Sequence, residues 1–202
     1  MKKYLLLTAI VVLLAYVILP RTASRVNASA EEYAVYSAVI ANMFDGERVT
    51  FDTGAKIKLL VIQDVTATDP TTRDDSRQDD QYFRRMFSTL TEGVAKDYRA
   101  KNNKPVRLVD SFGFIVKHVL VDKQEVDKIF IGGGSWEEFY KRYPDSGGFI
   151  ILSRVGFNAA MNQALVYIQH GCGGLCGTGH YVLLEKSVDR WRVVNRNMVW
   201  IS

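Results

Sequence analysis

The segment 148–202 constrains the fold most, because it divides into short apolar runs separated by turn residues. In the run 163–169, Ala164, Val166 and Ile168 alternate with Leu165 and Tyr167, which is the pattern of a β-strand. Three further runs have strand-like composition, and a turn at Ser187–Arg190 joins the last two of them; the runs cover 148–155, 181–186 and 191–201. This order predicts an antiparallel meander of about four strands.

Helical patterns precede the meander. Ser29-Ala30-Glu31-Glu32 is a capping box that predicts a helix from residue 29 to Met43. A second long helix and two short ones are expected at 79–100, 123–130 and 136–142, and further strands at 57–66 and within 105–121. Antiparallel strands packed with two main helices and two short ones predict the α+β class. By analogy of element order alone, an NTF2-like or cystatin-like cone is one instance of it.

The N-terminus predicts export. Lys2 and Lys3 precede an uncharged, almost wholly apolar run at 4–19, which Pro20 closes. Residues 1–28 therefore form either a cleaved signal peptide or an N-terminal membrane anchor that inserts through 4–20. Residues 29–202 are expected to form a single α+β domain outside the cytoplasm, in the cell envelope. An oxidising compartment of this kind favours disulfide formation.

The charge of the chain excludes one class of partner. Four of the 26 basic residues lie in the first 30 residues, which contain no acid, so 22 bases and 22 acids remain for the folded domain. Nucleic-acid binding needs a basic stripe on the domain itself, and none is visible. We therefore expect a partner protein or small ligand in the envelope, and no nucleic acid.

The segment 170–180 carries the chemistry that the sequence offers. Its four candidate ligands are His170, Cys172, Cys176 and His180, and five glycines lie among them. One interpretation is a hairpin loop closed by a Cys172–Cys176 disulfide. A second is a zinc or copper site built from all four residues, although the spacing H-x-C-x3-C-x3-H is unlike that of familiar zinc fingers. A third is a redox-active thiol pair, and a fourth is a hydrolase with a cysteine nucleophile and a histidine base.

The same region carries a resemblance. Cys172-Gly173-Gly174-Leu175-Cys176-Gly177, with the flanking runs 163–167, 181–186, 191–194 and 200–202, resembles a set of short bacterial exported proteins of uncharacterised function. A similar pattern precedes it at 153–158. The resemblance implies an exported domain and no particular activity. It does not carry histidine at positions 170 and 180, which weakens the metal interpretation and leaves the disulfide unaffected.

No convergent acid–base pair is apparent, so we expect a non-catalytic envelope domain with a binding or structural role. Trp136, Trp191 and Trp200 are expected in the core, and an aromatic groove for peptide or glycan is the alternative.

Overall fold

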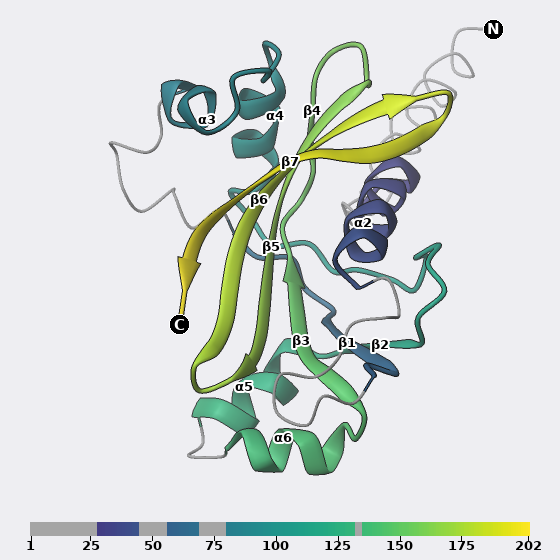
Figure 1. Ribbon diagram of the computed structural model, residues 1–202, viewed down its shortest axis with the longest axis vertical. Coiled ribbons are helices and arrows are strands. Elements are labelled where there is room, and N and C mark those ends of the chain that lie inside the picture. The colour runs from purple at the N-terminus through teal and green to yellow at the C-terminus, as the bar shows by residue number, and fades with distance from the viewer. Residues whose placement is uncertain (1–27, 45–55, 69–79, 132–134) are drawn as a thin grey trace, which may run out of the picture.

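The computed structural model describes residues 28–44, 56–68, 80–131 and 135–202 (Figure 1). In this part of the chain a seven-stranded sheet has the order β2-β1-β3-β5-β6-β7, and β4 pairs with β5 outside that path. The strands are β1 (Leu59–Gln63), β2 (His118–Val121), β3 (Ser146–Leu152), β4 (Gly156–Phe157), β5 (Gln163–Gly173), β6 (Cys176–Ser187) and β7 (Arg190–Ile201). The helices are α2 (Ala30–Met43), α3 (Asp80–Met86), α4 (Val94–Lys101), α5 (Lys123–Ile131) and α6 (Trp136–Arg142). The expected α+β class is confirmed.

The C-terminal meander is confirmed as the antiparallel half of the sheet. β3 pairs with β5, β5 with β6, and β6 with β7, all antiparallel. The other half is parallel, because β1 lies between β2 and β3 and runs in the same direction as both. The helices α5 and α6 lie in the connection from β2 to β3, which lets these strands run parallel. The NTF2-like or cystatin-like analogy stays a prediction.

The capping box at the start of α2 is also confirmed. The Ser29 hydroxyl accepts a hydrogen bond from the Glu32 backbone nitrogen at 3.2 Å, and the Glu32 carboxylate accepts one from the Ser29 nitrogen at 2.8 Å. Both bonds satisfy backbone donors that the first turn of a helix leaves unpaired. α2 then buries Tyr36, Val39 and Ile40 completely.

The single long helix expected at 79–100 is wrong, because the structure has two helices there. α3 ends at Met86, and α4 begins after Gly93, whose φ of 86° lies in the left-handed region. Thr91 helps to hold the intervening turn, since its backbone nitrogen and hydroxyl both donate to Gln163 Oε1, at 2.7 and 2.9 Å. The apolar spacing ran through the break because both helices face the same core cluster.

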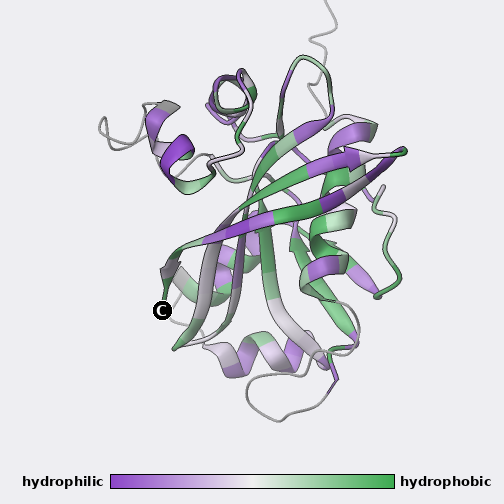
Figure 2. Cartoon of the chain, turned by 45° about the horizontal axis from the view of Figure 1, so that its top comes forward, coloured by the Kyte–Doolittle hydropathy of each residue, from purple (hydrophilic) through white to green (hydrophobic). Residues whose placement is uncertain are grey.

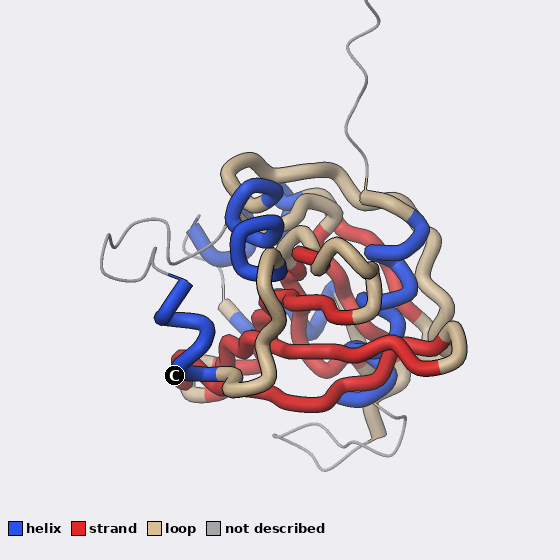
Figure 3. The backbone as a smooth tube through the Cα atoms, turned by 90° about the horizontal axis from the view of Figure 1, so that it is seen from above, coloured by secondary structure: helices blue, strands red, loops and turns tan. Residues whose placement is uncertain are grey.

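The two faces of the sheet are covered by different helices (Figures 1 and 3). α2 packs on one face, over Ile62, Ile150 and Val166. On the other face, α3 and α4 pack over one end of β5 and β6, while α5 and α6 pack over β1 and β3. β7 is the edge strand beyond β6, and the middle of this strand is largely hydrophilic (Figure 2). The site described below lies under α5 and α6.

A buried ion pair ties α2 to the segment after β3. Arg154 Nε donates to Glu32 Oε1 at 2.7 Å and Arg154 Nη2 donates to Glu32 Oε2 at 2.9 Å, with both residues buried. Burial alone would raise the pKa of Glu32, but the hydrogen bonds from Arg154 and from the Ser29 backbone outweigh it and lower this pKa. Asn102 bonds both backbone polar groups of Arg154, so the network is closed.

The proposed export segment, 1–28, lies outside the described residues except for Ala28. Among the helices that the structure describes, none has the length and apolar character needed to cross a bilayer.

Candidate ligand-binding site

The structure joins Cys172 and Cys176 in a disulfide with a Cα–Cα distance of 5.0 Å. The sequence predicts a hairpin loop over 170–180, but the turn in the structure is much shorter. β5 continues to Gly173 and β6 begins at Cys176, so the turn outside the strands is only Gly174–Leu175. The Leu175 side chain is 88% exposed at the tip. The disulfide therefore closes a β-hairpin at its turn, and both cysteines lie in strands rather than at a helix N-terminus, where thiol pKa values fall.

The glycines of this hairpin make room for tryptophan rings. A Cβ on Gly179 would lie 2.0 Å from the indole nitrogen of Trp200, and one on Gly177 would lie 3.1 Å from a carbon of the same ring. The Trp200 indole also donates a hydrogen bond to the Tyr167 hydroxyl at 2.7 Å. Gly177 and Gly179 thus reflect the close approach of the Trp200 ring, whereas a Cβ on Gly174 would meet no atom within 4 Å.

The four residues of the predicted zinc or copper site do not act together. The cysteines are bonded to each other, and His170 Nε2 lies 2.5 Å from the Gly147 carbonyl oxygen. Within the described residues, no group of three or more His, Cys, Asp or Glu side chains is arranged to hold a metal ion. His170 and His180 lie on the α2 face of the sheet, since His180 pairs with Ile168 in the register of β5 and β6.

His180 is a buried neutral histidine. Its side chain is 9% exposed, and its buried Nδ1 has no hydrogen-bond partner in the part of the chain that the structure describes. Burial, followed by the positive charge of Arg196 and by His170, lowers the pKa of His180 to about 4. At neutral pH the side chain is therefore uncharged, and a proton on it would be unfavourable.

α6 lies on the face of the sheet opposite α2 and is hydrogen-bonded to the disulfide-closed hairpin. The Tyr140 hydroxyl donates to the Cys172 carbonyl oxygen at 2.8 Å. Trp136, at the start of α6, stacks on Phe149 of β3 with ring centroids 5.8 Å apart and an angle of 14° between the planes. Both rings lie over Gly171, whose missing side chain gives them space. Helix, strand and hairpin therefore hold Trp136 in a fixed position.

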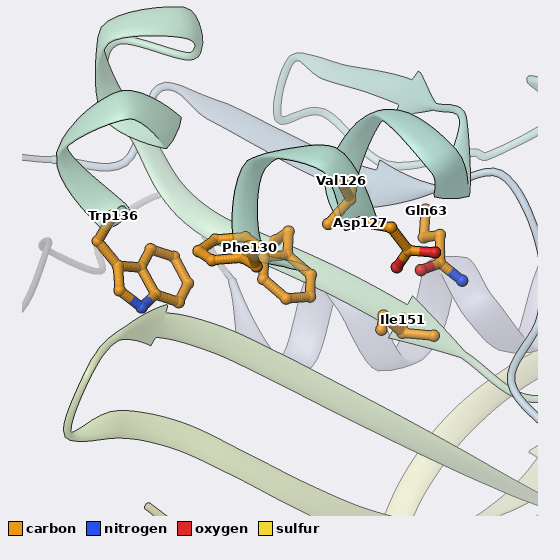
Figure 4. A pocket seen from close by; sticks show the side chains of 7 residues that line it. Gln63, Val126, Asp127, Phe130, Trp136 and Ile151 are labelled. Atoms are coloured by element: carbon orange, nitrogen blue, oxygen red, sulfur yellow. The ribbon is translucent and has the colours of Figure 1, made fainter. Parts of the chain in front are cut away.

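Beside Trp136 lies a pocket of about 220 Å³ between α5 and the sheet (Figure 4). Its apolar lining comes from α5, α6 and β3 and consists of Val126, Phe130, Trp136, Phe149 and Ile151. Phe130 contacts both of the stacked rings, with centroids 4.9 Å from Trp136 and 5.6 Å from Phe149. One end of the pocket is thus an aromatic box.

The other end of the pocket is polar. Gln63 of β1 and Asp127 of α5 lie there, near Ile151 (Figure 4). Gln63 is buried, and its amide nitrogen donates to the Val65 carbonyl oxygen at 2.7 Å, which assigns the amide oxygen as an acceptor. Asp127 forms an ion pair with Lys123 one turn earlier on α5, and its side chain is 36% exposed. Since Asp127 already holds the Lys123 ammonium, the acceptor oxygens suit a hydrogen-bond donor, or a cation that shares this carboxylate with Lys123.

The sequence identified only Trp136 among the seven lining residues. Gln63 carried a weak signal, as a polar residue within an apolar strand. Phe149 is brought close to Gln63 by the pairing of β1 with β3, and the packing of α5 on these strands adds Asp127 and Phe130, all of them distant from Gln63 along the chain.

No family model, curated protein or solved structure matches this chain. The site is therefore interpreted from its own geometry.

Proposed function

We propose that this chain is an exported envelope protein whose domain binds a small apolar group that carries a hydrogen-bond-donating or cationic end. The observation that carries the proposal is the pocket between α5, α6 and β3, where an aromatic box meets two acceptor side chains. Concave apolar sites with a few polar groups are the usual form of ligand sites. The domain is proposed to bind, not to catalyse.

The size of the pocket limits the ligand. Its volume of about 220 Å³ is below the range of roughly 300–1,000 Å³ that is typical of drug-sized ligands. One aromatic ring or one branched side chain fills such a space. The ligand is therefore a small aromatic or aliphatic amine, free or presented as a side chain by a partner protein.

The disulfide hairpin supports binding by making the pocket rigid. Tyr140 anchors α6 to the Cys172 carbonyl, and Trp136 rests on Gly171 in the same hairpin. A wall that is already ordered loses less conformational entropy when the ligand binds. The hairpin thus supports the site structurally, and the two cysteines have no chemical role in it.

Export supports the placement of this site in the cell envelope. The basic start and the apolar run at 4–19 fit a segment that enters a membrane, and we propose that 4–20 remain as an anchor. An oxidised Cys172–Cys176 pair is compatible with an extracytoplasmic compartment.

The proposal is tested by titrating the full-length chain in phospholipid nanodiscs with 2-phenylethylamine. The tryptophans are labelled with fluorine, and binding is followed by fluorine NMR. The resonance of Trp136 should shift, with a dissociation constant on the order of 1 mM for so small a ligand. The resonances of Trp191 and Trp200, which lie outside the pocket lining, are internal controls.

Two comparisons sharpen this test. 3-Phenylpropionate has the same ring but an anionic end, and it should bind at least tenfold more weakly because it faces Asp127. Asp127→Asn should weaken the amine and reduce the difference between the two probes. If 2-phenylethylamine leaves the Trp136 resonance unchanged at 20 times the expected dissociation constant, roughly 20 mM, the proposed site is wrong.

A further inference from the structure

Two exposed turns at one end of the molecule carry apolar residues in an unusual backbone conformation. Met161, in the turn between β4 and β5, has a φ of 54°, and Val188, in the turn between β6 and β7, has a φ of 47°. Residues other than glycine, asparagine and aspartate rarely adopt this left-handed region of backbone angles, and a β-branched valine there is a clear outlier. Asp189, which follows Val188 with a φ of 62°, suits this region, but Val188 and Met161 themselves are not the residues that these backbone angles favour.

Packing does not account for these residues either. The Val188 side chain is 93% exposed and that of Met161 is 42% exposed. A single exposed apolar residue is ordinary, but here exposure coincides twice with a disfavoured conformation. In the described part of the chain, no element covers Val188, so a surface outside the domain is the natural partner.

The two turns lie beside each other and beside the start of the domain. The Lys186 backbone nitrogen, just before the β6–β7 turn, donates to the Asn162 carbonyl oxygen of the β4–β5 turn at 2.8 Å. The Lys186 ammonium and the Trp191 indole both donate to Glu31 in the first turn of α2, at 2.8 and 2.6 Å. Figure 1 shows both turns at the end where the chain enters α2, and Figure 3 looks down on this end.

The length of chain before α2 indicates which surface this end meets. Seven residues, 21–27, separate Pro20, which closes the apolar run, from Ala28, so eight Cα–Cα steps join the two. Fully extended, they span at most about 30 Å. A bilayer that holds residues 4–19 therefore lies within about 30 Å of Ala28, at the end of the domain that carries the two turns.

We propose that the phospholipid bilayer is the surface on which these turns dock, with Val188 and Met161 inserted among the lipid headgroups. The inference rests on the membrane attachment in the proposed function. Arg190 and Arg192, both exposed next to Val188, can extend their guanidinium groups to lipid phosphates while their stems lie along the apolar boundary. The tether and the two turns together fix the orientation of the domain.

This orientation places the ligand pocket away from the membrane. α5 and α6, which line the pocket, lie at the opposite end of the molecule from the two turns (Figure 1). The disulfide-closed tip at Leu175 lies at that far end as well. The pocket therefore lies at the end of the domain that is distant from the bilayer, where a partner or a dissolved amine can reach it.

The test uses the full-length chain in phosphatidylethanolamine–phosphatidylglycerol liposomes, with the photoreactive residue p-benzoylphenylalanine replacing Val188, Met161 or Leu175 in turn. Leu175 is the matched control, because it is also an exposed apolar residue at a hairpin tip, with 88% of its side chain exposed. After flotation and illumination, mass spectrometry counts lipid adducts. Adducts at positions 188 and 161 should exceed those at 175 by at least tenfold.

The outcomes separate this inference from the proposed function. A chain that floats with the liposomes but forms no more adducts at 188 and 161 than at 175 overturns the docking and leaves the anchor intact. Cross-links from 188 to a second copy of the chain, in place of lipid, also overturn it. A chain that does not float overturns the membrane attachment together with the docking, while amine binding is measured independently by NMR.

Discussion

Lowering the pH from 7.5 to 5.0 should destabilise this protein through His180. Burial, Arg196 of β7 and His170 of β5 lower the pKa of His180 from 6.5 to about 4 in the folded state. The unfolded chain therefore takes up this proton first as the pH falls. The stability that His180 contributes is fully present above pH 6.5 and is lost as the pH falls toward 4.

The size of this loss follows from the two pKa values. Between pH 7.5 and pH 5.0, linkage with pKa values of 6.5 and about 4 gives a decrease of about 2 kcal/mol in the free energy of unfolding. For a domain of this length, that corresponds to a fall of roughly 4–8 °C in the melting temperature. Glu31 and Glu32 also have lowered pKa values, but carboxylates of this kind lose their contribution below about pH 4.5, outside the window.

The assay is urea unfolding of the full-length chain in a nonionic detergent, followed by tryptophan fluorescence at both pH values. His180→Gln removes the titrating group. In this variant the decrease in the free energy of unfolding between the two pH values should be smaller than in the wild type, by at least roughly 1.5 kcal/mol. His118→Gln, in β2 of the same sheet, is the control for replacing a histidine with glutamine elsewhere in the domain. An equal loss in wild type and His180→Gln would refute the reasoning.

Three further predictions concern the structural supports of the site, each measured by urea unfolding at pH 7.5. Gly179→Ala should destabilise the fold by about 1–3 kcal/mol, because the new Cβ would overlap Trp200. Gly174→Ala is the control, because the space around Gly174 is open, and it should change the free energy of unfolding by less than about 0.5 kcal/mol. An equal effect of the two substitutions would contradict the ring-packing explanation. Arg154→Ala should lower the free energy of unfolding by about 3–5 kcal/mol, because it leaves the buried carboxylate of Glu32 unpaired. A decrease of less than about 1 kcal/mol would show that the pair is dispensable. Cys172→Ser should cost only about 2 kcal/mol, since the disulfide closes a very short loop, and complete unfolding would contradict this limited role.

The local signals in the sequence were sufficient for much of the fold. The capping box at Ser29, the alternation in β5 and the spacing of Cys172 and Cys176 each depend on neighbours within a few residues, and all three predictions are confirmed. The break between α3 and α4 was missed because it depends on Gln163, which lies about 70 residues further along the chain and bonds the turn.

The site itself could not be predicted in the same way. Periodicity places a phenylalanine in a core but does not show which ring it meets, so the box of Phe130, Trp136 and Phe149 requires the sheet order. A glycine in this hairpin can serve either a special backbone angle or a close approach, and only the position of Trp200 shows that Gly177 and Gly179 serve a close approach. Pairing between β1 and β3 is nonlocal, and it determines where Gln63 lies.

The most direct test of amine binding in the aromatic box is to locate the ring of 2-phenylethylamine on the protein by intermolecular nuclear Overhauser effects. The full-length chain in nanodiscs, with Phe and Trp selectively labelled, should show contacts from the bound ring to Phe130, Trp136 and Phe149. Contacts only to residues outside the pocket, or none in a sample saturated with the amine, would contradict the central claim.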